Sequence, residues 1–259
     1  TSRRQRQMCI RDSSTPETVK ANSVAKAAGA TVVSVTHAAG SALTKEADYT
    51  IVHGFEANYA AKLEKMGYVL ALAVEILQQV EGFDKYDKMI EGLTNVFEAA
   101  ENAANSARKS AKEFAEKYKD APVVYVMSSG ASMEVAYSTS ICLMMEMQWV
   151  NSGSFHSGEF FHGPFEILDK RTSLFQLISV GRSRCNDERG IRFVNQYGGE
   201  RVYQLDAKEL GLNDIKDSVS EYFNHLIFAP ILNNVYMRAL SAVTHKDYMT
   251  RRYMWKLDY

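Results

Sequence analysis

The sequence predicts an α/β protein with two layers built on parallel sheets, the first incomplete on its N-terminal side. Three observations predict this class: a helix pattern and two strand patterns in 14–55, an Ala-, Lys- and Glu-rich stretch in 56–119, and a strand, helix, strand series from 122 onward. Alternating strands and helices are typical of parallel sheets covered by helices. We therefore expect a first layer at 14–55, a helical connector at 56–119 and a second layer at 120–259.

Composition is that of an ordinary globular protein. Of 259 residues, 46% are apolar and 24% are charged, and the formal net charge is −1. This balance gives no electrostatic reason to expect nucleic acid or an anionic membrane as a partner. No apolar run approaches the length of a membrane span. The three cysteines are too few and too scattered for a disulfide framework or a metal site, so we expect a cytoplasmic protein without a metal.

The first thirteen residues fit neither helix nor strand. "TSRRQRQMCIRDS" packs four arginines around an isolated Met-Cys-Ile. The stretch has no amphipathic stripe and contains an aspartate, which argues against a transit peptide. We interpret 1–13 as a non-native leader and expect the natural protein to begin further upstream.

The first layer starts with a capped helix. Ser14 is the expected N-cap, with Pro16 in the first turn and Glu17 three residues after the serine, as in a capping box. "TVVSVTH" (31–37) and "DYTIVHG" (48–54) are β-branched runs of strand length. This order predicts the back half of an open parallel sheet.

The connector and the second layer follow. The apolar spacing in 56–119 predicts two helices with a break near "EGFDKYD" (81–87). "PVVYVMSSG" (122–130) predicts a buried strand that runs into a small-residue turn, and 131–148 predicts a helix that is apolar nearly all round. A strand at 173–180, a helix at 187–199, a strand at 201–207 and a C-terminal helix at 220–243 complete the series. Pro230 should kink or break the last helix.

Hydroxyl groups at two predicted turns are candidate phosphate contacts. "SSTPET" (13–18) places Ser13, Ser14 and Thr15 at a helix start, where free N–H groups and the helix dipole favour an anion. A plain helix cap is the commoner explanation of such a motif. Ser128 and Ser129 lie in the turn after a predicted strand, where open α/β sheets bind their ligands.

A glutamate and a histidine are candidate proton-transfer groups. Glu146 lies near the end of an otherwise apolar helix, so it either reaches solvent or lies in a pocket. His162 lies in "GSFHSGEFFHGPFEIL" (153–168), a segment too broken for a helix, next to a Gly-Pro turn. An imidazole gives and takes protons near neutral pH, although most loop histidines lie at the surface. His156 fits that surface role better.

Two of these segments resemble a known family. "GEFFHGPFEIL" (158–168) resembles the Gly-Glu-x-x-His-Gly-Pro-x-x-x-(Ile/Leu) signature of the SIS (sugar isomerase) superfamily. Residues 14–48 resemble the second half of that family's first domain, with its Ser/Thr-rich phosphate loop. The resemblance implies two SIS domains, each an αβα sandwich on a flavodoxin-like parallel sheet. It also implies a homodimer with active sites shared across the interface. The Phe-rich loop 155–165 and the apolar C-terminal helix are the expected contact surface.

The resemblance also implies roles for single residues. In SIS isomerases a glutamate sixteen residues before the His-Gly-Pro histidine moves the proton between C1 and C2, and the histidine helps open the sugar ring. Glu146 and His162 have this spacing. Glu159 would be a supporting carboxylate.

Within the superfamily, the nearest likeness is to deglycases of fructoselysine 6-phosphate and related compounds. It lies in "LMMEMQW", "SGEFFHGPFEI" and the ending "TRRYMWKLDY" (250–259). These enzymes are implied to release an amino acid and glucose 6-phosphate from a glycated amino-acid phosphate, without a metal or organic cofactor.

Two alternatives stay open. Lys256 follows Arg252 by four residues, the spacing of the Schiff-base lysine in glucosamine-6-phosphate synthase. If Lys256 forms a Schiff base with a ketose, the protein is an aldose-ketose or amino-sugar phosphate isomerase. If Lys256 is a solvated side chain of the tail, a deglycase is favoured. SIS domains also occur in regulators that bind sugar phosphates without turning them over. Such a module needs no paired glutamate and histidine.

Overall fold

The structure, a computed structural model, describes residues 15–54, 61–254 and 256–257. The chain divides into two compact units, Thr1–Gly82 and Phe83–Tyr259. The division falls inside the predicted connector 56–119, so one of its two helices belongs to each unit. The expected leader 1–13 lies outside the described residues, and the expected domain boundaries stay predictions.

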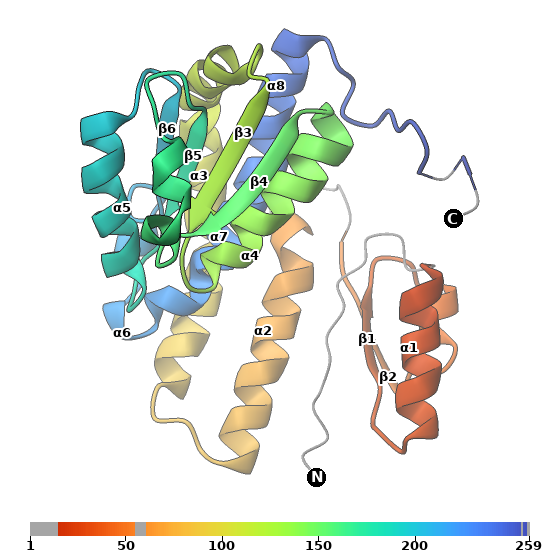
Figure 1. The fold of residues 1–259 in the computed structure, drawn as a ribbon. Helices are drawn as coiled ribbons and strands as arrows, with labels where there is room; N and C mark the ends of the chain where they lie inside the picture. Colours follow the sequence, from red (N-terminus) through yellow and green to blue (C-terminus); the bar gives the residue numbers. More distant parts are fainter. Residues whose placement is uncertain (1–14, 55–60, 255, 258–259) are drawn as a thin grey trace. The chain divides into compact units, whose positions relative to one another are not determined.

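The first unit contains the predicted order of helix, strand, strand (Figure 1). Its elements are α1 (Pro16–Ala27), β1 (Val33–Thr36), a 3₁₀ turn (Ala42–Thr44), β2 (Tyr49–Val52) and α2 (Ala61–Val80). The two strands pair in parallel, from Val33 opposite Tyr49 to Thr36 opposite Val52. Asn22 of α1 ties the helix to the strand, because its Nδ2 donates to Ser34 Oγ at 3.0 Å.

The start of α1 differs from the expectation by one residue. Thr15 holds the N-cap position, and its side chain makes no capping hydrogen bond. Pro16 is the first helical residue, because its ring already fixes a helical φ and its missing N–H needs no partner there. The expected cap, Ser14, and its neighbour Ser13 lie outside the described residues.

The second unit is built on a four-stranded parallel sheet in the order β4-β3-β5-β6 (Figure 1). The strands are β3 (Val123–Ser128), β4 (Asn151–His156), β5 (Leu174–Ile178) and β6 (Val202–Asp206). The helices are α3 (Tyr86–Tyr118), α4 (Ser132–Ser138) with its π-helical continuation Thr139–Gln148, α5 (Arg184–Tyr197), α6 (Asp217–Ser220), α7 (Asn224–Ile231) and α8 (Met237–Thr244).

The sheet is covered on both faces. On one face Phe175 of β5 meets Phe114 of α3, with ring centroids 4.9 Å apart, and α4, α7 and α8 lie on the same side (Figure 1). On the other face Leu174 packs in a cluster with Val194 of α5. Successive strand residues point to opposite faces of the sheet, so the neighbours Leu174 and Phe175 pack into two different core layers.

Strand β4 was not predicted. We expected a loop at 155–165, and for its first two residues this is wrong: β4 pairs in parallel with β3, from Asn151 opposite Val123 to His156 opposite Ser128. The strand has a single large apolar residue, Phe155, among Asn, Ser, Gly and His, so it lacks the alternation of apolar and polar residues that identifies a strand in a sequence. Pairing with β3 supplies the stability that local sequence lacks.

The C-terminal helix is continuous but uneven. Asp217–Thr244 is helical throughout, and by length and composition alone it could cross a membrane, although the sequence analysis found no such run. Pro230 lies inside α7, and the next residues, Leu232–Tyr236, form a π-helical turn. The predicted disturbance therefore takes the form of a widened turn after the proline. Ile227, Phe228, Ile231 and Tyr236 are fully buried, as in a core helix.

Candidate active site

Glu146 lies near the end of the π-helical segment, where the helix stops at Trp149 in a left-handed conformation (φ 58°). Its side chain is 26% exposed, and Arg251 from the C-terminal tail lies against it with 4% exposure. Arg251 donates to Glu146 Oε1 from Nε at 2.8 Å and lies within 2.7 Å through Nη2. Both contacts reach one oxygen, so Oε2 accepts no hydrogen bond from the part of the chain that the structure describes.

Basic side chains of the tail also lie on the ring of Trp149, the residue that ends the same helical segment. Lys246 Nζ and Arg252 Cζ lie 3.6 and 4.0 Å from the centre of the Trp149 ring. Burial lowers the pKa of Lys246, and the nearby Arg251 and Arg252 lower it further, against the opposite effect of Asp247. Three basic side chains of the tail therefore lie at the end of the π-helical segment, and among them Arg251 is the one with a described contact with Glu146.

Two other groups belong to the same cluster. Cys142 lies one turn before Glu146, and burial and the charge of Glu146 raise the pKa of its thiol, which disfavours a nucleophilic thiolate. Lys256, the candidate Schiff-base lysine, donates from Nζ to the backbone oxygen of Arg251 at 2.6 Å. The structure thus brings Lys256 and Glu146 together through Arg251.

His162 ends a short 3₁₀ turn, Phe160–His162, and its side chain is exposed. Its backbone N–H donates to the oxygen of Glu159 at 2.8 Å. Gly163 follows with φ 147°, a conformation that side chains disfavour. The Glu159 side chain is also exposed. His156 ends β4, and its Nδ1 accepts the Gly158 N–H at 3.0 Å, a local turn contact.

Glu146 and His162 do not meet within one chain. The π-helical segment packs against α8 and the π-helical turn of the C-terminal helix, on the face of the sheet that α3 covers. Phe161, beside His162, packs on Phe193 of α5 with ring centroids 5.5 Å apart, on the opposite face. The sheet therefore separates the two candidates.

The candidate phosphate contacts come from both units. Thr15 begins α1 in the first unit. Ser128 and Ser129 are fully buried at the end of β3, where their hydroxyls donate to Leu177 O at 2.9 Å and to Ser183 O at 3.0 Å. Here the two serines tie β3 to β5 and to the loop after it. Their role in binding phosphate stays a prediction.

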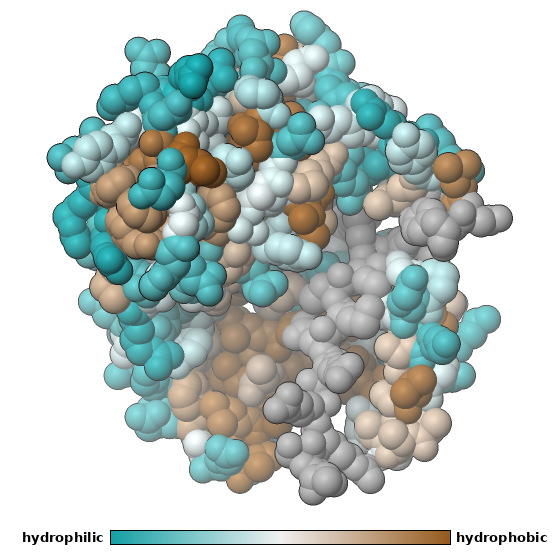
Figure 2. Space-filling view, in the orientation of Figure 1, coloured by the Kyte–Doolittle hydropathy of each residue, from teal (hydrophilic) through white to brown (hydrophobic). Residues whose placement is uncertain are grey.

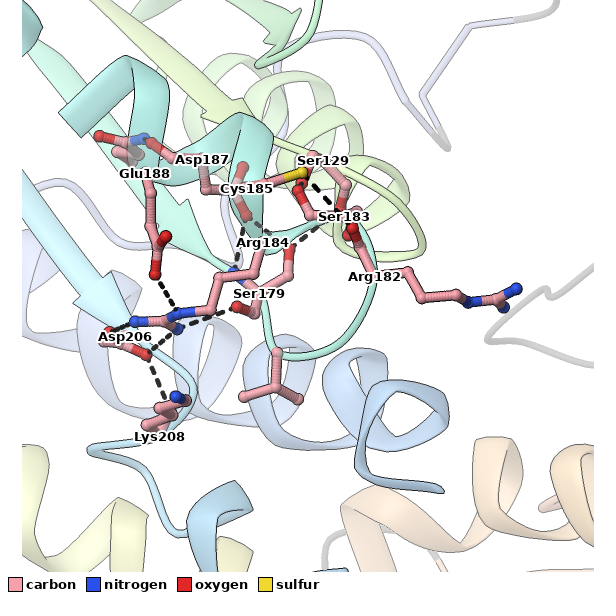
Figure 3. A network of polar contacts seen from close by, with 12 residues as sticks. Ser129, Ser179, Arg182, Ser183, Arg184, Cys185, Asp187, Glu188, Asp206 and Lys208 are labelled. Atoms are coloured by element: carbon pink, nitrogen blue, oxygen red, sulfur yellow. Dashed lines mark hydrogen bonds and ion pairs between the residues drawn. The ribbon is translucent and has the colours of Figure 1, made fainter. Parts of the chain in front are cut away.

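Sequence reasoning missed a buried carboxylate at this end of the sheet. Asp187, in the first turn of α5, is fully buried. It accepts hydrogen bonds from Ser157 Oγ at 2.6 Å, from Ser179 N at 2.9 Å and from Ser179 Oγ at 2.8 Å. Figure 3 shows Asp187, Ser179 and Ser129 gathered at the start of α5, beside the loop that carries Arg182 and Ser183. Asp187 therefore joins the ends of β4 and β5 to α5.

Asp187→Ala should destabilise the second unit by more than about 3 kcal/mol, because three hydrogen bonds to its carboxylate are lost and each such bond contributes about 1.5–3 kcal/mol. The control is Glu188→Ala in the same helix, whose exposed pair with Arg184 should cost about 0.2–1 kcal/mol. Urea unfolding followed by circular dichroism measures both changes. Equal losses for the two variants would contradict the role assigned to Asp187.

Comparison with known proteins gives the family. No family model matches the chain. It is 35% identical to the fructosamine deglycase FrlB of Bacillus subtilis (strain 168) over 97% of this chain and 76% of that protein. It is 25% identical to the fructoselysine 6-phosphate deglycase of Escherichia coli (strain K12) over 76% of this chain and 56% of that protein.

A solved structure agrees in both sequence and fold. The structure of a candidate phosphosugar isomerase from Salmonella typhimurium LT2 is 40% identical, with a TM-score of 0.90, over 95% of this chain and 76% of that one. Similarity of this extent covers both units and the segment that carries the His-Gly-Pro motif. The chain belongs to the SIS superfamily and, within it, to the family of the fructosamine deglycase FrlB.

Proposed function

We propose that this protein is a deglycase that releases an amine or amino acid and glucose 6-phosphate from a fructosamine 6-phosphate. The observation that carries the proposal is the 35% identity to the fructosamine deglycase FrlB over 97% of the chain. The chain spans 76% of that protein and 56% of the Escherichia coli deglycase, so the activity proposed is that of the whole protein. The free thiols of Cys142 and Cys185 fit a cytoplasmic location.

Glu146 is the proposed base. Its Oε2, which accepts no hydrogen bond from the described residues, takes a proton from C1 of the open-chain ketosamine, which gives an enaminol with a C1–C2 double bond. Return of the proton to C2 leaves an imine between C1 and the nitrogen. Water adds to C1, the amine leaves, and the aldehyde of glucose 6-phosphate remains.

His162 is the proposed acid in ring opening and in later proton transfers, and it comes from a second copy of the chain. The sheet separates Glu146 and His162 within one chain, so a shared substrate needs a homodimer. Of the expected contact surface, the loop 155–165 still faces the partner in this proposal, because it carries the exposed His162, whereas the C-terminal helix is core. Apolar residues instead lie open along α2, where Tyr68, Ile76 and Val80 are exposed (Figure 2).

An isomerase is the second candidate, favoured by the resemblance to a candidate phosphosugar isomerase. An isomerase would interconvert two sugar phosphates and release no amine. A regulatory module would bind the sugar phosphate and leave it unchanged.

The test is incubation of the protein with a panel of glycated amino-acid 6-phosphates, with fructose 6-phosphate as a parallel substrate. A deglycase should release free amino acid and glucose 6-phosphate in equal amounts from at least one member of the panel. Coupled glucose-6-phosphate dehydrogenase and amino-acid chromatography measure the two products. Glucose 6-phosphate formed from fructose 6-phosphate alone would favour the isomerase. Binding without any product would favour the regulatory module.

A further inference from the structure

The C-terminal tail, defined here as residues 245–257, fixes one side of the proposed base. Its central residue, Arg251, is the most deeply buried charged side chain of the tail, with 4% exposure, and it reaches Glu146 from 105 positions further along the chain. The tail begins at His245 in a left-handed conformation (φ 54°), which ends α8 and turns the chain. The contact between tail and base is therefore set by the fold and not by sequence proximity.

We propose that Arg251 is a positioning residue that aims Glu146 at the substrate. This proposal rests on the proposed role of Glu146 as the base. The guanidinium contacts Oε1 through both Nε and Nη2, and this two-point contact of the planar fork holds Oε1 in place more firmly than a single contact would. Oε2 is left to take the proton from C1.

The guanidinium is itself held on its far side. Nη1 donates to the backbone oxygen of Tyr248 at 2.6 Å, and Lys256 Nζ donates to the backbone oxygen of Arg251 at 2.6 Å. Both contacts come from the tail, so the arginine is preorganised before a substrate arrives. A base held in this way pays no ordering cost in the transition state.

Lys256 supports Arg251 in this arrangement. Its amine is bound to the Arg251 backbone, which places it where it supports the arginine. The other charged groups nearby are Lys246 and Arg252 on the Trp149 ring and Asp247, which binds Thr250 within the tail. Arg251 alone among these tail side chains has a described contact with the Glu146 carboxylate.

Arg251→Ala should lower kcat by up to about 100-fold with little change in KM, because a misplaced catalytic group can cost about that much in rate. Arg251→Lys keeps the charge but loses the fork, and it should recover only part of kcat. Added guanidinium chloride at non-denaturing concentration should restore kcat in Arg251→Ala, since the ion can fill the space that the side chain leaves. Arg171→Met removes an exposed arginine from the loop before β5, outside the candidate site, and serves as the matched control, with kcat near that of the unmodified protein.

The rescue separates positioning from folding. Sodium chloride at equal ionic strength should give no rescue, and guanidinium should not rescue Glu146→Gln combined with Arg251→Ala. A folded Arg251→Ala protein with unchanged kcat would overturn the proposal. A second contrary result would be that guanidinium fails to restore kcat in Arg251→Ala and that Arg251→Lys has a kcat as low as that of Arg251→Ala. If the unmodified protein releases no glucose 6-phosphate from any fructosamine phosphate, the proposed function itself fails, which is a distinct result.

Discussion

Glu146→Gln is expected to lower kcat for glucose 6-phosphate release by about 10²–10⁴-fold, the usual cost of removing a general base. Glutamine has nearly the shape of glutamate, and its amide oxygen can still accept from Arg251, whose contacts now reach Oε1 at 2.8 and 2.7 Å. The substitution therefore removes the basic oxygen and little else. KM should change little, because the lost interaction is with a proton that moves only in the transition state.

The measurement is steady-state release of glucose 6-phosphate, with circular dichroism to confirm folding. Glu134→Gln is a matched control, since Glu134 lies on the same helical stretch, in the first turn of α4, and has no proposed part in the chemistry. Near-normal turnover in Glu146→Gln would refute the proposed base and favour the regulatory, binding-only module.

His162→Ala is expected to lower kcat by a similar factor, about 10²–10⁴-fold, because ring opening and proton donation would pass to water. The exposed side chain contributes little to packing, so the variant should fold normally. His156→Ala is the control. It loses only the local contact with the Gly158 N–H, and its turnover should stay close to normal.

Mixing the two inactive variants tests whether the site is shared between subunits. After subunit exchange, a heterodimer of Glu146→Gln and His162→Ala holds one site with both native residues and one with neither. Equal mixing should therefore restore about one quarter of the activity of the unmodified protein. Native mass spectrometry confirms that heterodimers have formed. Heterodimers without activity would contradict a site shared across the interface.

Strong local patterns predicted most of the fold. The β-branched runs at 31–37 and 48–54 became β1 and β2, and the break at 81–87 separates α2 from α3. Strand β4 escaped prediction because Asn, Ser and Gly have weak strand propensity. Edge strands of this kind are stabilised by the neighbour that pairs with them, and a single sequence does not reveal that neighbour.

The candidate site divides in the same way. The spacing of Glu146 and His162 and the His-Gly-Pro motif were visible in the sequence, because they are local, and they indicated the superfamily before any coordinates. Glu146 and His162 lie on opposite faces because the segment 157–173, which contains His162, runs over the face of the sheet that α5 covers. The packing of Phe160, Phe161 and Phe165 holds the segment on that face.

The sequence by itself determined the α/β class, the superfamily and the two candidate proton-transfer residues, since each rests on residue types within a short span of chain. The tertiary structure alone decided that Arg251 contacts Glu146 and that Asp187 joins β4, β5 and α5. The physical reason is range. Backbone propensity and side-chain periodicity act over a few residues, whereas a hydrogen bond between residues 105 positions apart exists only once the core has packed and brought them together.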